Sequence, residues 1–120
     1  MKLCMVIPCY NEEEVLRETA LRLAAKYDKL ISEGLISNDS RIVFVDDGSK
    51  DDTWKIITEL HSKSACFDGL KLSRNRGHQN ALLAGLLTVK DRFDAVISMD
   101  ADLQDDINAI DKMIESYSDG

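Results

Sequence analysis

Four short apolar runs alternate along the chain with longer stretches that carry apolar residues at helical spacing. The runs are rich in β-branched and aliphatic residues, and they predict strands at Leu3–Ile7, Arg41–Val45, Leu70–Leu72 and Ala95–Met99. This order, a strand followed by a helix and repeated along the chain, predicts an α/β fold. We expect a three-layer α/β/α arrangement (βαβαβαβα) with a mostly parallel sheet and right-handed crossovers.

The stretches between the runs predict helices. Their apolar stripes extend from Leu16 to Ile31, from Trp54 to Leu60 and from Ile107 to Tyr117. The stretch from Ala81 to Val89 is apolar almost all round, which predicts a helix that is buried on most sides.

Two capping pairs are predicted at helix starts. Asn11 with Glu14 would cap the first helix, and Ser49 with Asp52 would cap the second.

The bulk properties exclude several classes of protein. With 120 residues the chain is long enough for one domain, expected over 1–120, and its net charge of −7 argues against a nucleic-acid partner. Three cysteines without CxxC spacing predict neither a disulfide framework nor a zinc site, and free thiols fit the reducing cytoplasm. No apolar run approaches 18 residues, so no transmembrane helix is predicted.

Aspartates gather where two of the predicted strands end. Eight of the fifteen lie within residues 46–52 and 100–106. Asp100 and Asp102 can converge on one point because Ala101 between them is small, and a divalent cation would relieve their repulsion. The alternative is an acidic turn in which Asp105 or Asp106 caps the next helix. Both interpretations stay open.

Other polar residues follow the remaining strands. Asp46 and Asp47 could form a turn, or could accept hydrogen bonds from ribose or from a base, where an imide N–H would favour uracil or guanine. Arg74 and Arg76 are either solvated loop charges or partners of phosphate. His78 is more typical of a helix start than of a catalytic residue. The carboxyl ends of parallel strands meet at one edge, so these groups predict a ligand site there.

Two common phosphate-binding motifs are absent from the sequence. It contains no GxGxxG after the first strand and no GxxxxGK[ST], which disfavours a Rossmann dinucleotide site and a P-loop.

Four ordered motifs together resemble glycosyltransferase family 2, whose members have the GT-A fold. They start at Pro8 (PCYNEE), Val45 (VDDGSKDDT), Ser73 (SRNRGHQNA) and Asp100 (DADLQD), and they cover nearly the whole chain. The last two are most similar to the branch that glycosylates polyprenyl phosphates, which includes dolichyl-phosphate mannosyltransferases and bactoprenol glucosyltransferases. Asp106-Ile107 stands where many members carry prolines.

The resemblance implies roles for individual residues. Pro8 and Tyr10 would flank the nucleotide base, Asp47 with Asp46 would bind it, and Arg74 would lie near the base or the phosphates. Asp102, the implied catalytic residue, would bind Mg²⁺ or Mn²⁺ together with Asp100 and Gln104. The full set implied to bind the donor is Pro8, Tyr10, Asn11, Glu12, Asp46, Asp47, Arg74, Gly77, Asp100, Ala101 and Asp102.

The implied activity is inverting transfer of a sugar from a UDP- or GDP-sugar to a polyprenyl phosphate or a saccharide, in cell-wall, polysaccharide or glycolipid synthesis. Because family members are longer, we expect this chain to be the donor-binding half, inactive alone and prone to self-association. We expect the full-length protein at the cytoplasmic face of a membrane.

Two alternatives remain at this point. A receiver-like phosphoacceptor domain would also be an α/β chain of this size, but here the acidic pair follows the second strand and no fifth strand with a terminal lysine is present. A non-catalytic nucleotide-binding module is the other.

Overall fold

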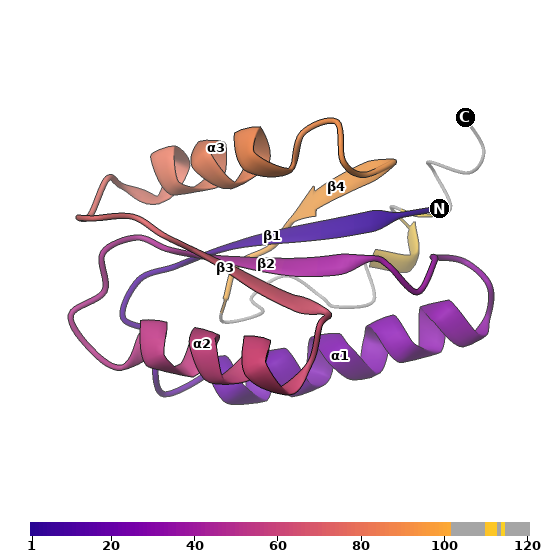
Figure 1. Cartoon of the computed structure of the whole chain (residues 1–120), viewed down its shortest axis with the longest axis horizontal. Coiled ribbons are helices and arrows are strands. Elements are labelled where there is room, and N and C mark those ends of the chain that lie inside the picture. Colours follow the sequence, from indigo (N-terminus) through magenta and orange to yellow (C-terminus); the bar gives the residue numbers. More distant parts are fainter. Residues whose placement is uncertain (102–109, 113, 115–120) are drawn as a thin grey trace.

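Residues 1–101, 110–112 and 114 are described in the computed structural model. A four-stranded parallel sheet forms the centre of the molecule, in the order β3-β2-β1-β4 (Figure 1). Its strands are β1 (Leu3–Cys9), β2 (Arg41–Asp46), β3 (Phe67–Lys71) and β4 (Ala95–Ser98). The prediction of an α/β fold with a parallel sheet is confirmed.

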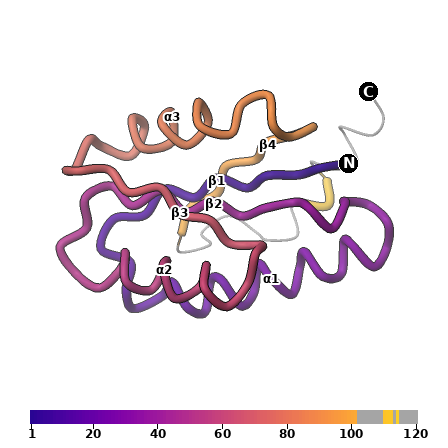
Figure 2. Tube along the Cα trace, in the orientation of Figure 1, coloured from indigo at the N-terminus to yellow at the C-terminus, as the bar shows by residue number. Residues whose placement is uncertain are grey.

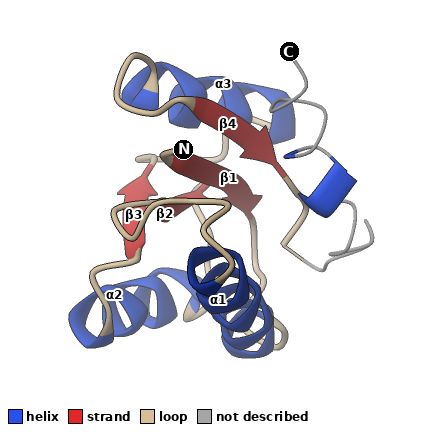
Figure 3. Cartoon of the chain, turned by 90° about the vertical axis from the view of Figure 1, so that its right-hand side faces the viewer, coloured by secondary structure: helices blue, strands red, loops and turns tan. Residues whose placement is uncertain are grey.

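Helices cover both faces of this sheet. Helices α1 (Leu16–Ser32) and α2 (Thr53–Lys63) lie on one face, and α3 (His78–Val89) lies on the other (Figures 1 and 3). Residues 110–112 and 114 are helical, and the rest of the predicted last helix lies outside the described residues. Ile110 and Ile114 are buried in the same core as α1 and α2.

The two central strands are buried on both faces, which explains their continuous apolar sequences. Side chains of β1 alternate between the two cores: Met5 and Ile7 face α1 and α2, whereas Cys4 and Val6 face α3. No helix in the described part of the chain is long and apolar enough to cross a membrane.

Strand β3 begins at Phe67, three residues before its predicted start at Leu70. Gly69 accounts for the difference, because a glycine within a run obscures the strand pattern. A β-carbon at Gly69 would lie 2.5 Å from Ile57 Cγ2 of α2, so this helix packs closely against the backbone of β3.

Helix α3 is not buried on most sides, which corrects the prediction for residues 81–89. Only one face meets the sheet, where Ala81, Gly85 and Val89 are buried. Leu83 and Leu87 are 52% and 61% exposed on the opposite face. The sequence could not distinguish these faces because both are apolar.

Both predicted capping pairs are wrong. Helices α1 and α2 have no side-chain hydrogen bond at their N-caps, Val15 and Asp52. Asn11 adopts a positive φ of 52°, and its side-chain oxygen accepts a hydrogen bond from the backbone N–H of Lys50 instead. Figure 2 shows that the loops after β1, β2 and β3 leave the sheet at the same end of the molecule.

Candidate functional site

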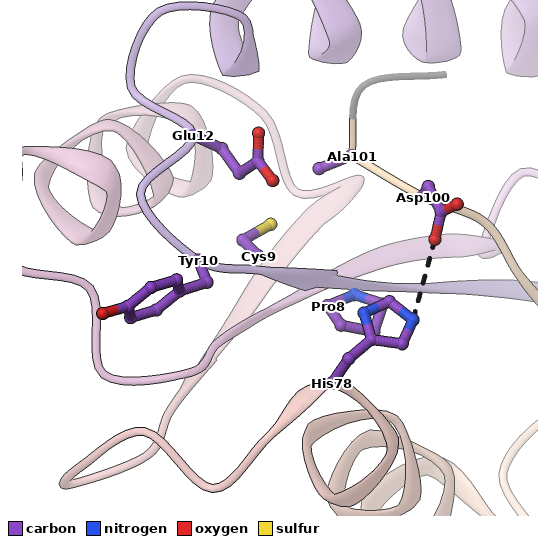
Figure 4. Close-up of a pocket in the computed structure, with 7 residues that line it drawn as sticks. All are labelled: Pro8, Cys9, Tyr10, Glu12, His78, Asp100 and Ala101. Atoms are coloured by element: carbon purple, nitrogen blue, oxygen red, sulfur yellow. Dashed lines mark ion pairs between the residues drawn. The ribbon is translucent and has the colours of Figure 1, made fainter. Parts of the chain in front are cut away.

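A pocket of about 190 Å³ lies where the carboxyl ends of β1 and β4 meet the start of α3 (Figure 4). Three elements contribute to it: the end of β1 with the loop that follows, the first residue of α3, and the chain just after β4. The described residues that line it are Pro8, Cys9, Tyr10, Glu12, His78, Asp100 and Ala101.

Asp100 and His78 lie next to each other in the lining of this pocket. Asp100 Oδ1 lies 3.6 Å from His78 Nε2, and the two side chains are 43% and 60% exposed (Figure 4). A ligand that entered the pocket would therefore meet the carboxylate and the imidazole side by side.

The chain at Asp100 is held on both sides. Met99 N–H donates to the carbonyl of Val6 on β1, at 3.3 Å. Ala101 accepts a hydrogen bond of 2.6 Å from the hydroxyl of Thr19 on α1. These two anchors fix the backbone immediately before and after the Asp100 carboxylate.

The end of β1 forms the apolar wall. Tyr10 is 39% exposed, so part of its side chain is accessible to a planar group. Cys9 beside it is 1% exposed, and burial, reinforced by the carboxylates of Glu12 and Asp46, raises the pKa of its thiol well above the usual value. Cys9 is therefore a neutral thiol and a poor nucleophile.

The loops after β1 and β2 are joined by hydrogen bonds. Asn11 N–H donates to Ser49 Oγ and Glu12 N–H donates to Thr53 Oγ1, each at 2.8 Å. The Lys50 N–H bond to Asn11 Oδ1 is also 2.8 Å long. Asn11 thus shapes the loop that carries Glu12 into the pocket.

Asp46 and Asp47 are buried, at 0% and 3% exposure, and neither is among the described residues that line the pocket. Asp46 Oδ1 accepts from Ser49 N–H at 3.1 Å, while Oδ2 is buried without a hydrogen-bond partner among the described residues. Both oxygens of Asp47 accept backbone N–H groups, from Arg76 at 2.6 Å and from Gly77 at 3.1 Å.

The structure thus divides the predicted donor-binding residues into two groups. Five line the pocket: Pro8, Tyr10, Glu12, Asp100 and Ala101. Five others lie at the end of β2 or in the loops after β1, β2 and β3: Asn11, Asp46, Asp47, Arg74 and Gly77. Asp102 and Gln104 lie outside the described residues.

His78 and Cys9 are the pocket residues that the sequence analysis did not assign, and of these His78 carries a polar group that points toward Asp100. The available signal was its position at the start of a helix that follows a strand, next to a predicted donor-binding loop. That signal alone could not show that its imidazole points toward Asp100.

Of the three predicted metal ligands, Asp100 is the one that the structure describes. Its carboxylate offers the hard oxygen ligands that Mg²⁺ and Mn²⁺ prefer, and it is exposed to the pocket. In residues 1–101, 110–112 and 114, no group of three or more His, Cys, Asp or Glu side chains could hold a metal ion. Asp100 therefore fits the role of one ligand, and the other two predicted ligands, Asp102 and Gln104, lie outside the described residues.

Comparison with known proteins supports the resemblance. The sequence model of "Glycosyl transferase family 2" matches residues 4–120. The chain is 53% identical, over 98% of its length, to the uncharacterized glycosyltransferase YkoT of Bacillus subtilis, and covers 35% of that protein. It is 39% identical over its whole length to the prophage bactoprenol glucosyl transferase homolog of Escherichia coli, and covers 37% of it.

The solved structure of Staphylococcus aureus TarS, residues 1–349, has a similar fold. The TM-score is 0.64 at 24% identity, over 93% of this chain and 33% of the TarS chain. The predicted GT-A fold is confirmed.

The chain spans little more than a third of the length of the curated relatives named above. The family match nevertheless extends over nearly the whole chain, and it excludes the receiver-domain alternative. The chain belongs to glycosyltransferase family 2.

Proposed function

We propose that this chain binds the nucleoside-diphosphate sugar donor of an inverting glycosyltransferase. The observation that carries the proposal is the pocket at the carboxyl ends of β1 and β4, where Tyr10 and Asp100 come from different strand ends to line one cavity. In open α/β sheets this edge is where ligands bind, and residues of the first and last of the four motifs, from Pro8 and from Asp100, line the pocket there.

The wall formed by Pro8 and Tyr10 suits a planar base, because a partly exposed aromatic ring can stack on it. Asp100, on the opposite wall, suits the hydroxyl groups of a ribose or sugar, which donate hydrogen bonds to a carboxylate. The donor would then extend across the pocket from Tyr10 toward Asp100.

The proposal includes a divalent cation, Mg²⁺ or Mn²⁺, held by Asp100 with Asp102 and Gln104. When bound, such a cation neutralises the charge that develops on the leaving nucleoside diphosphate. This chain's own residues orient the donor: Thr19 and Val6 fix the backbone around Asp100. The acceptor oxygen attacks the anomeric carbon from the face opposite the diphosphate, which inverts that carbon.

We propose a polyprenyl phosphate as the acceptor. Support comes from the name of one relative, a bactoprenol glucosyl transferase homolog that is 39% identical over the whole chain. A lipid phosphate is already anionic and needs little help from a general base, whereas a saccharide hydroxyl would need one. A lipid acceptor would place the protein at the cytoplasmic face of a membrane, in glycolipid or cell-wall synthesis.

The proposal is tested by titrating the chain with UDP-glucose and with GDP-mannose, each with and without Mn²⁺, in a calorimeter. We expect metal-dependent binding of at least one donor, weakened about tenfold or more by Asp100→Asn. Asp28→Asn is the matched control, because it removes the same charge from an exposed position on α1.

Three outcomes are decisive. Binding that Asp100→Asn weakens about tenfold or more and Asp28→Asn leaves unchanged supports the proposal. The absence of binding by either donor contradicts it. A parallel assay measures sugar transfer to undecaprenyl phosphate by a full-length homologue. If that homologue binds the donor but transfers no sugar, the result would favour a non-catalytic nucleotide-binding module.

A further inference from the structure

A second pocket, of about 170 Å³, lies between helix α2 and strand β3. Within the described sheet β3 is the strand at one edge, and β4, which leads to Asp100, is the strand at the other (Figures 1 and 3). The two pockets share no residue. The described residues that line this one, here named the Trp54 pocket, are Trp54, Ile57, Thr58, His61, Asp68 and Gly69.

Trp54 contributes an aromatic surface to this pocket. The ring packs over the backbone of β3, because a β-carbon at Gly69 would lie only 3.1 Å from Trp54 Cζ3. Lys71 Nζ lies 5.8 Å from the centre of the ring, within the range of a cation–π contact. Trp54 is nevertheless only half-buried, so part of its side chain remains accessible.

The backbone of Gly69 adds hydrogen-bonding groups at the outer edge of β3. The backbone groups of Cys66 and Leu72 bond to β2. Because these groups alternate in direction along a strand, the N–H and C=O of Gly69 point the other way, and they face no other strand of the described sheet. A bound molecule can therefore use both a donor and an acceptor at this position.

His61 and Asp68 add polar side chains beside this backbone. His61 Nδ1 lies 2.7 Å from the carbonyl oxygen of Phe67 and 3.4 Å from Asp68 Oδ1. A carbonyl oxygen can only accept, so Nδ1 carries a proton, and in the neutral ring Nε2 is an acceptor. The side chains of His61 and Asp68 are 60% and 41% exposed. Both can therefore accept hydrogen bonds from the hydroxyl groups of a bound molecule.

An accessible aromatic surface beside hydroxyl-binding groups is the combination that a pyranose ring requires. The C–H groups of the sugar pack against the aromatic ring, and its hydroxyl groups need acceptors and donors. A pyranose whose substituents are all equatorial, such as a β-glucoside, keeps its C–H faces unobstructed. Trp54 supplies the surface, and Asp68, His61 and the Gly69 backbone supply the polar groups.

A peptide that adds a strand to β3 is the alternative occupant of this edge. Such a peptide needs several successive free backbone groups along the edge. β3 has only five residues, and the Phe67 carbonyl is already bonded to His61. The short free edge therefore favours a small hydroxylated ligand over a peptide.

We infer that the Trp54 pocket is a saccharide-binding site, which holds one pyranose ring with equatorial hydroxyl groups. This inference goes beyond the proposed donor binding and does not depend on it, because the two pockets share no residue. In a member of a glycosyltransferase family, such a site would hold a glycan at a distance from the donor.

Trp54 makes the test selective, because it is the only tryptophan in the sequence and gives the only indole N–H signal in an NMR spectrum. The ¹⁵N-labelled chain is titrated with methyl β-D-glucopyranoside and with cellobiose. Sorbitol is the control ligand, since it has similar hydroxyl groups but no ring.

We expect the Trp54 indole signal and the Gly69 amide signal to shift with both sugars and not with sorbitol. The amides of Tyr10 and Ala101, in the other pocket, should stay in place. The dissociation constant of the monosaccharide should be on the order of 1 mM, which corresponds to the binding energy per atom that small ligands reach.

Two variants test the residues of the pocket. Asp68→Ala removes an exposed carboxylate and should weaken sugar binding about fivefold or more, whereas Asp28→Ala on the exposed surface of α1 should leave it unchanged. Trp54→Leu keeps an apolar side chain but removes the ring, and it should abolish the response of the Gly69 amide. If Trp54→Leu fails to fold, Asp68→Ala still decides, because this side chain is exposed.

Three results would overturn the inference. They are the absence of a Trp54 response to either sugar, an equal response to sorbitol, and equal binding by wild type and Asp68→Ala. Signals of Trp54 and Gly69 that change with protein concentration alone would assign the edge of β3 to a strand of a second copy, and would also overturn it. Nucleotide titrations measure the pocket around Asp100 separately, so either proposal can fail without the other.

Discussion

The hydroxyl of Thr19 donates a buried hydrogen bond of 2.6 Å to the carbonyl oxygen of Ala101, which joins the second turn of α1 to the residue after Asp100. Thr19 itself is 3% exposed. The carboxylate of Asp47 makes a similar contact with the loop before α3. Both use buried side chains to fix a backbone segment that carries a pocket residue.

Replacing Thr19 by valine should destabilise the protein by about 1–3 kcal/mol, because the Ala101 carbonyl would then be buried without a donor. Thr19→Ser keeps the hydroxyl and is the matched control, expected to cost less. Urea unfolding of the two variants measures the difference in the free energy of unfolding. Equal losses in both would show that the Thr19 methyl group, and not its hydroxyl, is what matters.

Gly48 and Gly34 form a natural pair for measuring the contact between the loops after β2 and β3. Both have a positive φ, +72° and +74°, but a β-carbon at Gly34 would meet nothing within 4 Å, whereas at Gly48 it would meet Asn75 and Arg74. Gly34→Ala should therefore cost only the backbone strain, about 1–2 kcal/mol.

Gly48→Ala should cost at least about 2 kcal/mol more than Gly34→Ala, since a backbone segment must also move. Thermal or urea unfolding of both variants gives the comparison. If the two losses of stability were the same, the close contact of Gly48 with the 74–77 loop would not exist in solution.

The three cysteines should differ in their reactivity toward iodoacetamide at pH 8. Burial raises the pKa of Cys4 to about 12 from an ordinary 9.0, and it raises the pKa of Cys9 further. Cys66 is only partly buried, and burial raises its pKa less strongly. Because the thiolate is the reactive form, a higher pKa means a smaller reactive fraction at pH 8.

We expect Cys66 to be alkylated first in the folded protein, with Cys4 and Cys9 labelled only on unfolding. Peptide mapping by mass spectrometry gives the order, and the protein in urea serves as the fully reactive control. Alkylation of Cys9 as fast as Cys66 would contradict the buried position of Cys9 in the pocket wall.

Asp51 should make stability depend on pH. Burial alone would raise the pKa of its carboxyl, but hydrogen bonds from the Thr53 side chain and from the backbone N–H groups of Thr53 and Glu13 outweigh it. The net effect holds the pKa below the ordinary 3.8. A carboxyl whose pKa is lower in the folded protein than in the unfolded chain stabilises the folded state at any pH above the unfolded pKa. This stabilisation is lost as the pH falls through the pKa of the folded protein.

Asp51→Asn should therefore lower the free energy of unfolding at pH 7 by up to about 1 kcal/mol, with the difference from wild type shrinking below pH 3.8. Urea titrations at pH 7 and at lower pH test this, with Asp28→Asn on the surface of α1 as the control. A difference that grew as the pH fell would contradict the sign of the shift.

The local sequence predicted the strands that are buried on both faces. It did not predict features that depend on contacts between residues far apart in the sequence. β1 and β2 were recognised because double burial requires a continuous apolar run, as at Val43 and Phe44. The face of α3 that carries Leu83 could not be distinguished, because nothing in its own sequence says which side meets the sheet. Asn11 was misassigned for a similar reason: its hydrogen-bond partner, Lys50, lies 39 residues away.

The sequence predicted that the site lies at this edge of the sheet. It also predicted that Asp100, Tyr10 and Pro8 belong to the site, and these three residues do line one pocket. The roles of these residues remain predictions. The connection from Asp47 to Arg76 and Gly77 was not predictable, because a carboxylate after a strand looks the same whether it faces a ligand or a neighbouring loop.

The most direct test of the account is to locate nucleotide binding on the chain by NMR. The ¹⁵N-labelled protein is titrated with UDP-glucose and GDP-mannose in the presence of Mg²⁺. A larger cavity of about 390 Å³ provides an internal control, because it lies at the opposite end of the sheet, beside Tyr27, Arg41 and Cys66.

The account predicts that the amide signals of Tyr10, Glu12, His78 and Ala101 shift with one of these donors, while those around Tyr27 and Cys66 stay in place. Shifts confined to the cavity beside Cys66, or none with either donor, would contradict it.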